Sequence, residues 1–129
     1  MHLTIQPGSG VPIYLQLVSQ IRYRVASRQL APGSELPAIR TLAEQLLINP
    51  NTVARAYLEL ERAGVVVKRQ GSGTYVAESP PRLPRDQRQC ILAERADALL
   101  VEAGQMGLSM EDVLQLLRER HEKMEAAAR

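Results

Sequence analysis

Apolar residues recur every three or four positions in several stretches of the chain, a spacing that places them on one face of an α-helix. The first predicted helix begins at Pro12, a residue suited to the first helical turn. Its apolar face repeats every four residues: Ile13, Leu17, Ile21 and Val25. A turn at residues 31–33 ends this helix, and a second helix is predicted over residues 37–47. Four of its side chains are expected to point inward: Ile39, Leu42, Ala43 and Leu46.

The start of a third helix, over residues 51–63, is marked by the pair Asn49 and Pro50. Asparagine can accept from the free N–H groups of a first turn, and proline fits the first helical position. The pattern then changes to two β-rich runs, residues 65–69 and 74–77, around a turn with two glycines. Three helices followed by a two-stranded hairpin predict a winged helix-turn-helix, a fold that is mainly α with a small β-hairpin.

Three prolines within residues 80–84 interrupt any regular element and predict a joint in the chain. We expect a winged helix-turn-helix domain at residues 11–79, a proline-rich linker at 80–85 and a two-helix segment at 86–126. Ser109 is expected to cap the last helix, with Asp112 three residues later as a variant of the capping box. Two helices of about forty residues in total bury too little apolar surface to be stable alone, so they need a partner surface.

Charge is divided unevenly along the 129 residues, although the formal net charge is only +2. Residues 1–79 hold eight basic and five acidic side chains, a net of +3. Residues 80–129 hold eight basic and nine acidic side chains, a net of −1. The surplus on the first part favours an anionic partner there. The aromatic content of 3% argues against single-strand binding, which depends on stacking rings.

The sequence contains no constellation typical of an enzyme. His2 and His121 are the only histidines, and neither shares a catalytic spacing with a serine or cysteine and a carboxylate. The run at residues 71–73 joins two strands and opens no helix, unlike a phosphate-binding loop. We therefore expect no catalytic residue, no metal site and no cofactor.

The compartment follows from the cysteine count and from the apolar runs. Cys90 is the single cysteine, so no intramolecular disulfide can form, and the thiol is either inert or a redox sensor. The first ten residues lack the features of a signal peptide. No apolar run reaches the roughly 18 to 20 residues of a membrane span. We expect a cytoplasmic protein with no membrane partner.

The third helix carries side chains suited to reading double-stranded DNA. A major groove admits one α-helix, and the first residues of that helix meet the base edges. Asn51 can pair with adenine, Arg55 with guanine, and Thr52 with bases or phosphates. In the alternative interpretation, Asn51 and Thr52 only cap the helix and Arg55 is a solvated surface charge.

Two further elements supply candidate DNA contacts. Arg40 and Thr41 lie near the start of the second helix, where that helix would cross the DNA backbone, although a lone arginine often serves solubility alone. In the hairpin, Lys68 and Arg69 precede a turn whose glycines allow the main chain to approach a groove closely. The tip of this turn consists of Gln70, Gly71 and Ser72.

Several motifs in order resemble the GntR family of bacterial transcription regulators: PIYLQL at residues 12–17, LAPGSELPAIRTLA at 30–43, NTV at 51–53 and GSGTYV at 71–76. The resemblance implies DNA contacts by the arginine of the Leu-Pro-x-x-Arg motif, here Arg40. It also implies contacts by Asn51 and Thr52 at the start of the recognition helix, and by Gln70 and Gly71 at the wing tip.

The chain departs from the family pattern at Pro50, where many members carry arginine or serine. The contact of such an arginine is therefore absent, and Arg55, one turn further on, is a hypothetical replacement. The sequence of residues 49–52 and the short C-terminal part are similar to the YtrA-like branch. That resemblance implies dimerisation through two C-terminal helices and the repression of transporter operons.

A second copy of the chain is the partner expected for the C-terminal helices. Six apolar residues are candidates for this contact: Leu92, Leu99, Leu100, Val113, Leu114 and Leu117. A homodimer predicts an inverted-repeat operator with half-sites about 10 bp apart, or a multiple of that spacing. Alternatively, the helices fold back on their own winged helix around a small effector site, and whether an effector exists is left open.

A second function class also remains possible for the N-terminal part. A winged helix can serve only as a protein-interaction module, with no DNA readout. That interpretation predicts an uncharged recognition helix and wing, and the basic surplus of the first part argues against it.

Overall fold

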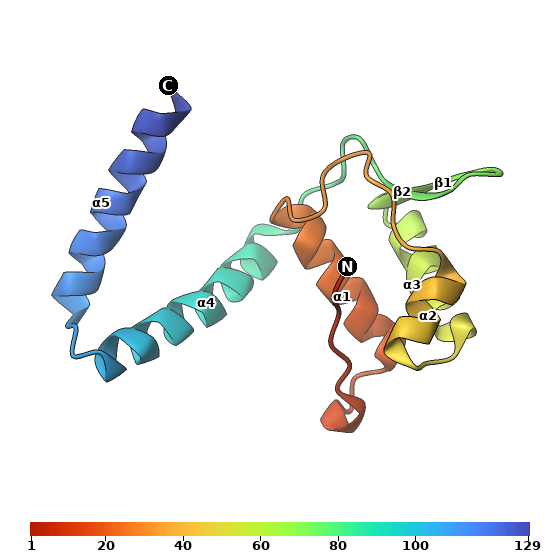
Figure 1. The fold of residues 1–129 in the computed structure, drawn as a ribbon, viewed down its shortest axis with the longest axis horizontal. Coiled ribbons are helices and arrows are strands. Elements are labelled where there is room, and N and C mark those ends of the chain that lie inside the picture. The colour runs from red at the N-terminus through yellow and green to blue at the C-terminus, as the bar shows by residue number, and fades with distance from the viewer. The chain divides into compact units, whose positions relative to one another are not determined.

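The computed structural model describes residues 1–129, which divide into two compact units, Met1–Leu83 and Pro84–Arg129. The first unit (Figure 1) contains α1 (Ile13–Ala26), α2 (Ile39–Leu46), α3 (Pro50–Arg62), β1 (Val66–Arg69) and β2 (Gly73–Val76). The second unit contains α4 (Arg85–Gln105) and α5 (Met110–Ala128). This order confirms the predicted fold class, a winged helix-turn-helix followed by two helices.

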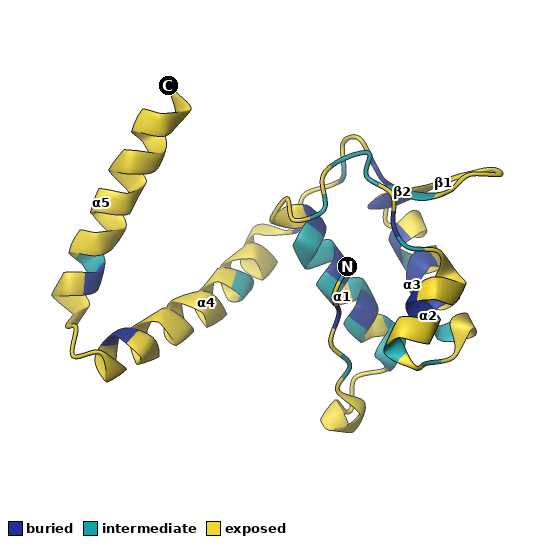
Figure 2. Cartoon of the chain, in the orientation of Figure 1, coloured by how far each residue is buried: buried dark blue, intermediate teal, exposed yellow.

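The core of the first unit lies between the three helices and the base of the hairpin (Figure 2). Helix α3 packs against α1, α2 and β1, so it is the central element. The largest fully buried side chains come from all of these elements: Leu17, Ile21, Leu42, Val53, Leu60, Val66 and Val76. The helical spacing of α1 and α3 in the sequence therefore predicts the core faces of both helices correctly.

Ile39 does not point inward as predicted, since 37% of its surface is exposed. Helix α2 begins at Ile39, two residues later than expected, and its buried face starts only one turn further on at Leu42 and Ala43. Leu36, in the extended segment before the helix, is buried in the core. The apolar pattern around residue 37 therefore belongs to an extended chain rather than to a longer helix.

That extended segment adds a third strand-like edge to the predicted hairpin. β1 and β2 pair antiparallel, with Val66 opposite Val76 and Arg69 opposite Gly73. On the other side of β2, the Val76 N–H donates to the Ser34 carbonyl at 2.8 Å, and the Leu36 N–H donates to the Thr74 carbonyl at 2.8 Å. Because an isolated two-stranded hairpin is only marginally stable in water, this third edge anchors the wing to the helical core.

The first six residues lie extended along α1 and belong to the same unit. Leu3 is buried in the core, so the unit begins ten residues before the predicted domain start. Side chains four residues apart on α1 bind main-chain groups two residues apart on this segment. The Gln6 N–H donates to Gln16 Oε1 at 2.8 Å, the Thr4 N–H to Gln20 Oε1 at 2.9 Å, and Arg24 donates to the His2 carbonyl. The two repeats match because four helical residues rise about 6 Å and two extended residues about 6.6 Å.

The turn between α2 and α3 closes as the sequence predicts. Asn49 caps α3, accepting at Oδ1 from the Asn51 N–H at 2.8 Å, and Pro50 occupies the first helical position. Before it, α2 ends at Leu47, whose φ of +57° is left-handed and whose side chain is 91% exposed. A leucine carries a steric penalty in this conformation that glycine does not.

The second unit has almost no core of its own. Only Ala103 and Val113 are buried, one on each side of the turn between α4 and α5. The predicted capping box is present, since Ser109 Oγ accepts from the Asp112 N–H and Asp112 Oδ2 accepts from the Ser109 N–H. These hydrogen bonds lower the pKa of the Asp112 carboxyl. The start of α5 is thus well capped, while most apolar side chains of both helices remain exposed.

Three further observations concern membrane spans, metal sites and the single cysteine. None of its helices combines the length and the apolar character needed to cross a bilayer. No group of three or more His, Cys, Asp or Glu side chains is arranged to hold a metal ion. Cys90 is a free, exposed thiol on α4.

We predict that Leu47→Gly raises the free energy of unfolding by up to about 1 kcal/mol, because glycine adopts the left-handed turn without steric cost. Urea unfolding followed by circular dichroism measures the change. Leu47→Ala is the matched control, since alanine removes the exposed side chain but keeps the strain. An equal gain from both variants would contradict the assignment of the strain to the backbone.

Candidate nucleic-acid interface

The predicted contacts on α2 lie at the start of the helix, on its surface. Arg40 and Thr41 are its second and third residues, and both are exposed. Arg40 forms no hydrogen bond or ion pair within the chain. Its guanidinium is therefore free to meet an anionic partner.

The first turn of α3 also presents side chains without intramolecular partners. Because Asn49 is the N-cap, Asn51 and Thr52 are not needed to cap the helix. Neither the side-chain amide of Asn51 nor the Thr52 hydroxyl makes a hydrogen bond within the chain, and Asn51 is exposed. The capping role considered for these two residues thus belongs to Asn49.

Arg55 is not the freely solvated charge of the alternative interpretation. Its guanidinium carbon lies 3.9 Å from the centre of the Tyr14 ring, and Nη2 donates to the Tyr14 hydroxyl at 3.2 Å. A stacked and hydrogen-bonded pair of this kind joins α3 to the start of α1. Arg55 thus acts as a brace between these helices, whether or not it also contacts DNA.

A single tyrosine fixes the relation between α3 and the segment that precedes α2. Tyr57 is 5% exposed, and its hydroxyl donates to the Pro37 carbonyl at 2.7 Å. Pro37 lies three residues before Arg40 in the chain. Tyr57 therefore holds the start of α2 against α3, the two elements that carry the candidate contacts. Its burial raises the pKa of the Tyr57 hydroxyl.

The wing presents an exposed tip formed by residues 70–72. The Ser72 N–H donates to the Arg69 carbonyl at 3.0 Å, which closes the turn. Gly71 has a φ of +76° with open space where a Cβ would stand, so it suits both the turn and a close approach to a groove. Lys68 is exposed and has no partner in the chain.

Arg69 has a more defined environment than its sequence position alone indicates. Its guanidinium carbon lies 4.4 Å from the centre of the Tyr75 ring. The Tyr75 hydroxyl is 2.6 Å from Ser72 Oγ, so the ring is tied to the wing tip. Sequence reasoning missed this contact between Arg69 and Tyr75. The strand register indicates it, because it places residues 69 and 75 on the same face of the hairpin.

The relatives of this chain are regulators with the same architecture. The profile of the bacterial regulatory proteins of the gntR family matches residues 13–76. Identity is 37% to the HTH-type transcriptional regulator YhcF of Bacillus subtilis, over 83% of this chain and 88% of the relative. It is 32% to the HTH-type transcriptional repressor YtrA of the same organism, over 91% and 90%. The chain belongs to the GntR family.

A solved structure extends this similarity to the second unit. The GntR-family transcription factor YtrA of Sulfolobus acidocaldarius is 29% identical and has a TM-score of 0.56, covering 94% of this chain and 97% of that protein. The protein is thus a DNA-binding transcription regulator of the GntR family and not an enzyme. Its similarity to the YtrA proteins includes the two C-terminal helices.

The candidate dimerisation residues of this GntR-family chain differ in exposure. Leu92 is 64% exposed, and Leu99, Leu100 and Leu117 are also open to solvent. Val113 is only 3% exposed, because it is buried inside the single chain near the turn between α4 and α5. Four of the six predicted residues therefore form open surface, while Val113 and the half-buried Leu114 already contribute to packing within the unit.

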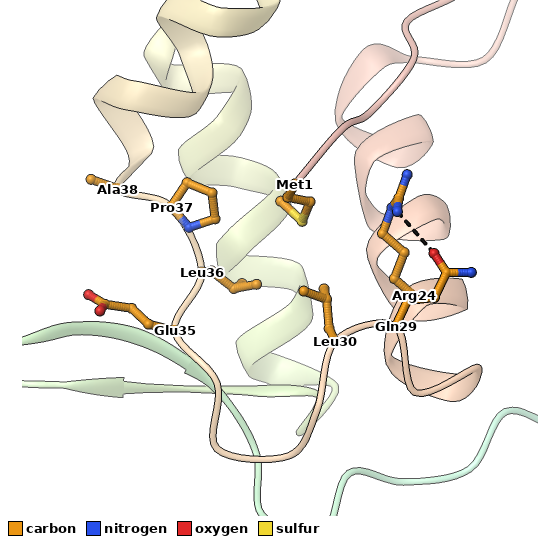
Figure 3. A pocket seen from close by; sticks show the side chains of 8 residues that line it. All are labelled: Met1, Arg24, Gln29, Leu30, Glu35, Leu36, Pro37 and Ala38. Atoms are coloured by element: carbon orange, nitrogen blue, oxygen red, sulfur yellow. Dashed lines mark hydrogen bonds between the residues drawn. The ribbon is translucent and has the colours of Figure 1, made fainter.

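A pocket of about 540 Å³ lies between the N-terminal segment, the end of α1 and the extended segment that leads into α2 (Figure 3). Apolar residues, among them Met1, Leu30 and Leu36, form much of its wall. On its polar side, Arg24 Nη1 donates to Gln29 Oε1 at 3.0 Å, and Arg24 also donates to the His2 carbonyl. The Arg24 guanidinium thus already binds the chain itself on both of its terminal nitrogens.

We predict that Tyr57→Phe lowers the free energy of unfolding at pH 7 by about 1 kcal/mol, because the Pro37 carbonyl loses its donor. In the wild type, burial keeps the Tyr57 pKa above that of an unfolded tyrosine. The contribution of Tyr57 to the free energy of unfolding is therefore complete below about pH 10. Above that pH it falls by at most about 1.4 kcal/mol per pH unit. The free energy of unfolding of Tyr57→Phe should fall less above about pH 10, because phenylalanine has no hydroxyl to ionise.

Urea unfolding between pH 7 and pH 11 measures both effects. Tyr75→Phe is the matched control, since it removes a hydroxyl from the wing but leaves Tyr57 in place. If the control reduced the alkaline loss as much as Tyr57→Phe, the effect would not come from the α3 anchor.

Proposed function

We propose that this regulator is a homodimeric repressor that binds an inverted-repeat operator sequence-specifically. One observation carries the proposal: Arg40, Asn51 and Lys68 present polar side chains without partners at the start of α2, the start of α3 and the wing. Asn49 and Tyr57 fix the starts of α3 and α2 in place through hydrogen bonds of 2.8 and 2.7 Å. Groups held in position but left unpaired are suited to an external ligand.

In the proposed complex, α3 enters the major groove with its first turn toward the bases. Asn51 reads adenine, and the Thr52 hydroxyl, which has no partner within the chain, binds a phosphate. Arg40 contacts the DNA from α2, with Thr41 beside it. Lys68 and the tip of residues 70–72 contact the backbone from the wing. Arg55 lies one turn after Asn51 on the same face of α3 and keeps its contact with Tyr14.

The second unit supplies the two-fold axis of the proposed homodimer. Its exposed apolar residues include Leu92, Leu99 and Leu100 on one side of α4. A second copy would cover this surface and stabilise helices that bury only two residues on their own. Two recognition helices related by such an axis match an inverted repeat with half-sites about 10 bp apart, or a multiple of that spacing.

The repressor role is supported by the relative from Bacillus subtilis that is named as a repressor, YtrA. Control of a transporter operon is supported by the sequence resemblance to the YtrA-like branch. A winged helix that only binds proteins is the competing function. Titration with random duplex at low salt separates the two, because a DNA-binding protein should bind in the micromolar range or tighter.

Selection of bound sites from a random duplex pool tests the operator directly. We expect the wild type to select an inverted repeat, and Asn51→Ala to lose the preference at one base pair of each half-site. Arg40→Ala should weaken binding to the selected site by roughly 1–3 kcal/mol. The matched control is Arg62→Ala, which removes an exposed arginine from the last turn of α3, paired with Glu59 at 3.4 Å.

The results can contradict this assignment in two ways. Unchanged specificity in Asn51→Ala would remove that residue from the reading surface. A loss in Arg62→Ala as large as that in Arg40→Ala would mean that the general positive charge, rather than the start of α2, determines binding.

We predict that Leu99→Asp converts the dimer into a monomer, because a buried unpaired carboxylate costs several kcal/mol at an apolar interface. A loss of about 3 kcal/mol raises the dissociation constant more than a hundredfold. Sedimentation at micromolar concentration measures the change. Val101→Asp is the matched control, since Val101 is 62% exposed and two residues away, on the opposite side of α4. A dimer that tolerates Leu99→Asp would refute the proposed interface.

A further inference from the structure

Two arginines of the first unit stack on tyrosine rings, but only one keeps all of its hydrogen-bond donors free. Arg55 donates to the Tyr14 hydroxyl, whereas Arg69 makes no hydrogen bond or ion pair within the chain. We propose that the wing reads the minor groove of the operator through Arg69, and that Tyr75 is the positioning residue that holds its guanidinium. The inference rests on the proposed operator binding and assigns the wing a sequence preference of its own.

Tyr75 provides a rigid platform because it lies in the central strand of the wing. It is paired with Val67 of β1 on one side and with Glu35 on the other. Its hydroxyl is tied to Ser72 Oγ at 2.6 Å, so the far end of the ring is fixed as well. The ring therefore lies in one place before DNA is present.

The position of Arg69 on this platform favours an external acceptor. A guanidinium stacked through its face leaves its five N–H groups directed outward in the plane. Glu35 lies on the same side of the wing, close to Gly73, yet it forms no salt bridge with Arg69. The charge is thus not neutralised within the chain. Because the side chain is already ordered, less conformational entropy is lost when it binds.

The minor groove is the site that fits the geometry of the wing. With α3 in the major groove, a neighbouring element along the duplex meets the adjacent minor groove, which is only about 6 Å wide. Gly71 carries no side chain in the middle of the wing tip, and nothing lies within 4 Å of the place where its Cβ would stand. Arginine is the side chain drawn to narrow A·T minor grooves by their negative potential. Lys68 lies on the other face of β1, where it is available for a phosphate.

Operator variants that differ only where the wing falls can test this proposal. The flanking pairs are made A·T, G·C or inosine·C; inosine lacks the minor-groove amino group of guanine but keeps its major-groove edge. We expect the wild type to prefer A·T over G·C roughly tenfold. Inosine·C should restore binding to the A·T level. Arg69→Ala should bind all three about equally, with a salt slope reduced by about 1.

Variants at position 75 separate positioning from folding. Tyr75→Phe keeps the ring face and should retain most of the A·T preference, whereas Tyr75→Leu removes the face and should lose it. The double variant that combines Tyr75→Leu with Arg69→Ala should bind no worse than Arg69→Ala alone, because the two residues act through one contact. Thermal unfolding of each variant shows whether the wing remains folded, and Arg69→Ala tests the proposal even if Tyr75→Leu does not fold.

Several outcomes would overturn the inference. If Arg69→Ala weakened all three operators by the same factor, Arg69 would be a phosphate contact. If inosine·C behaved as G·C in the wild type, the preference would come from the major groove. A wild type that binds the selected operator but shows no flanking preference would refute the role of Arg69 alone. A wild type that binds no duplex would instead refute the proposed function itself.

Discussion

The burial of one face of α3 is the constraint on which the rest of the structure depends. Val53, Ala56, Tyr57 and Leu60 point into the core, where α1, α2 and β1 all pack against the same helix. A helix of 13 residues that buries this stripe must expose the opposite one. Asn51 lies on the exposed side at the start of the helix, so the packing of the core alone decides what the recognition helix presents. The hydrogen bond from Tyr57 to Pro37 extends this constraint to the start of α2.

The arginines of the first unit illustrate how neighbouring groups divide structural and binding roles. Arg24 and Arg55 are occupied within the chain, by the N-terminal segment and by Tyr14. Arg40 has no partner, and Arg69 has only a ring beneath it. Unpaired positive charges repel one another and contribute little to folding, so their placement around α2 and the wing is better explained by an anionic ligand. In the proposed complex, folding and binding use different members of this set of arginines.

The second unit is limited by the surface that two helices can bury. A complete capping box at Ser109 defines where α5 begins, but only Ala103 and Val113 are shielded from solvent. Local interactions of this kind stabilise a helix by about 1 kcal/mol each and cannot replace a core. Covering the exposed leucines with a second copy would couple the stability of these helices to dimerisation, and so to the two-fold symmetry of the proposed operator.

The sequence by itself determined the order of the elements, the core faces of α1 and α3, and the cap at Asn49, because these depend on residues close together in the chain. It did not reveal that the segment before α2 pairs with β2, that Ile39 is exposed, or that the first six residues lie along α1. The candidate residues of the DNA interface were named from the pattern and the family resemblance. The residues that hold these elements in place within the chain could not be named in this way. Tyr14 and Arg55 are 41 residues apart, and Tyr57 and Pro37 are 20 apart. Only the packing of distant segments decides which polar groups are satisfied within the chain and which remain free to bind.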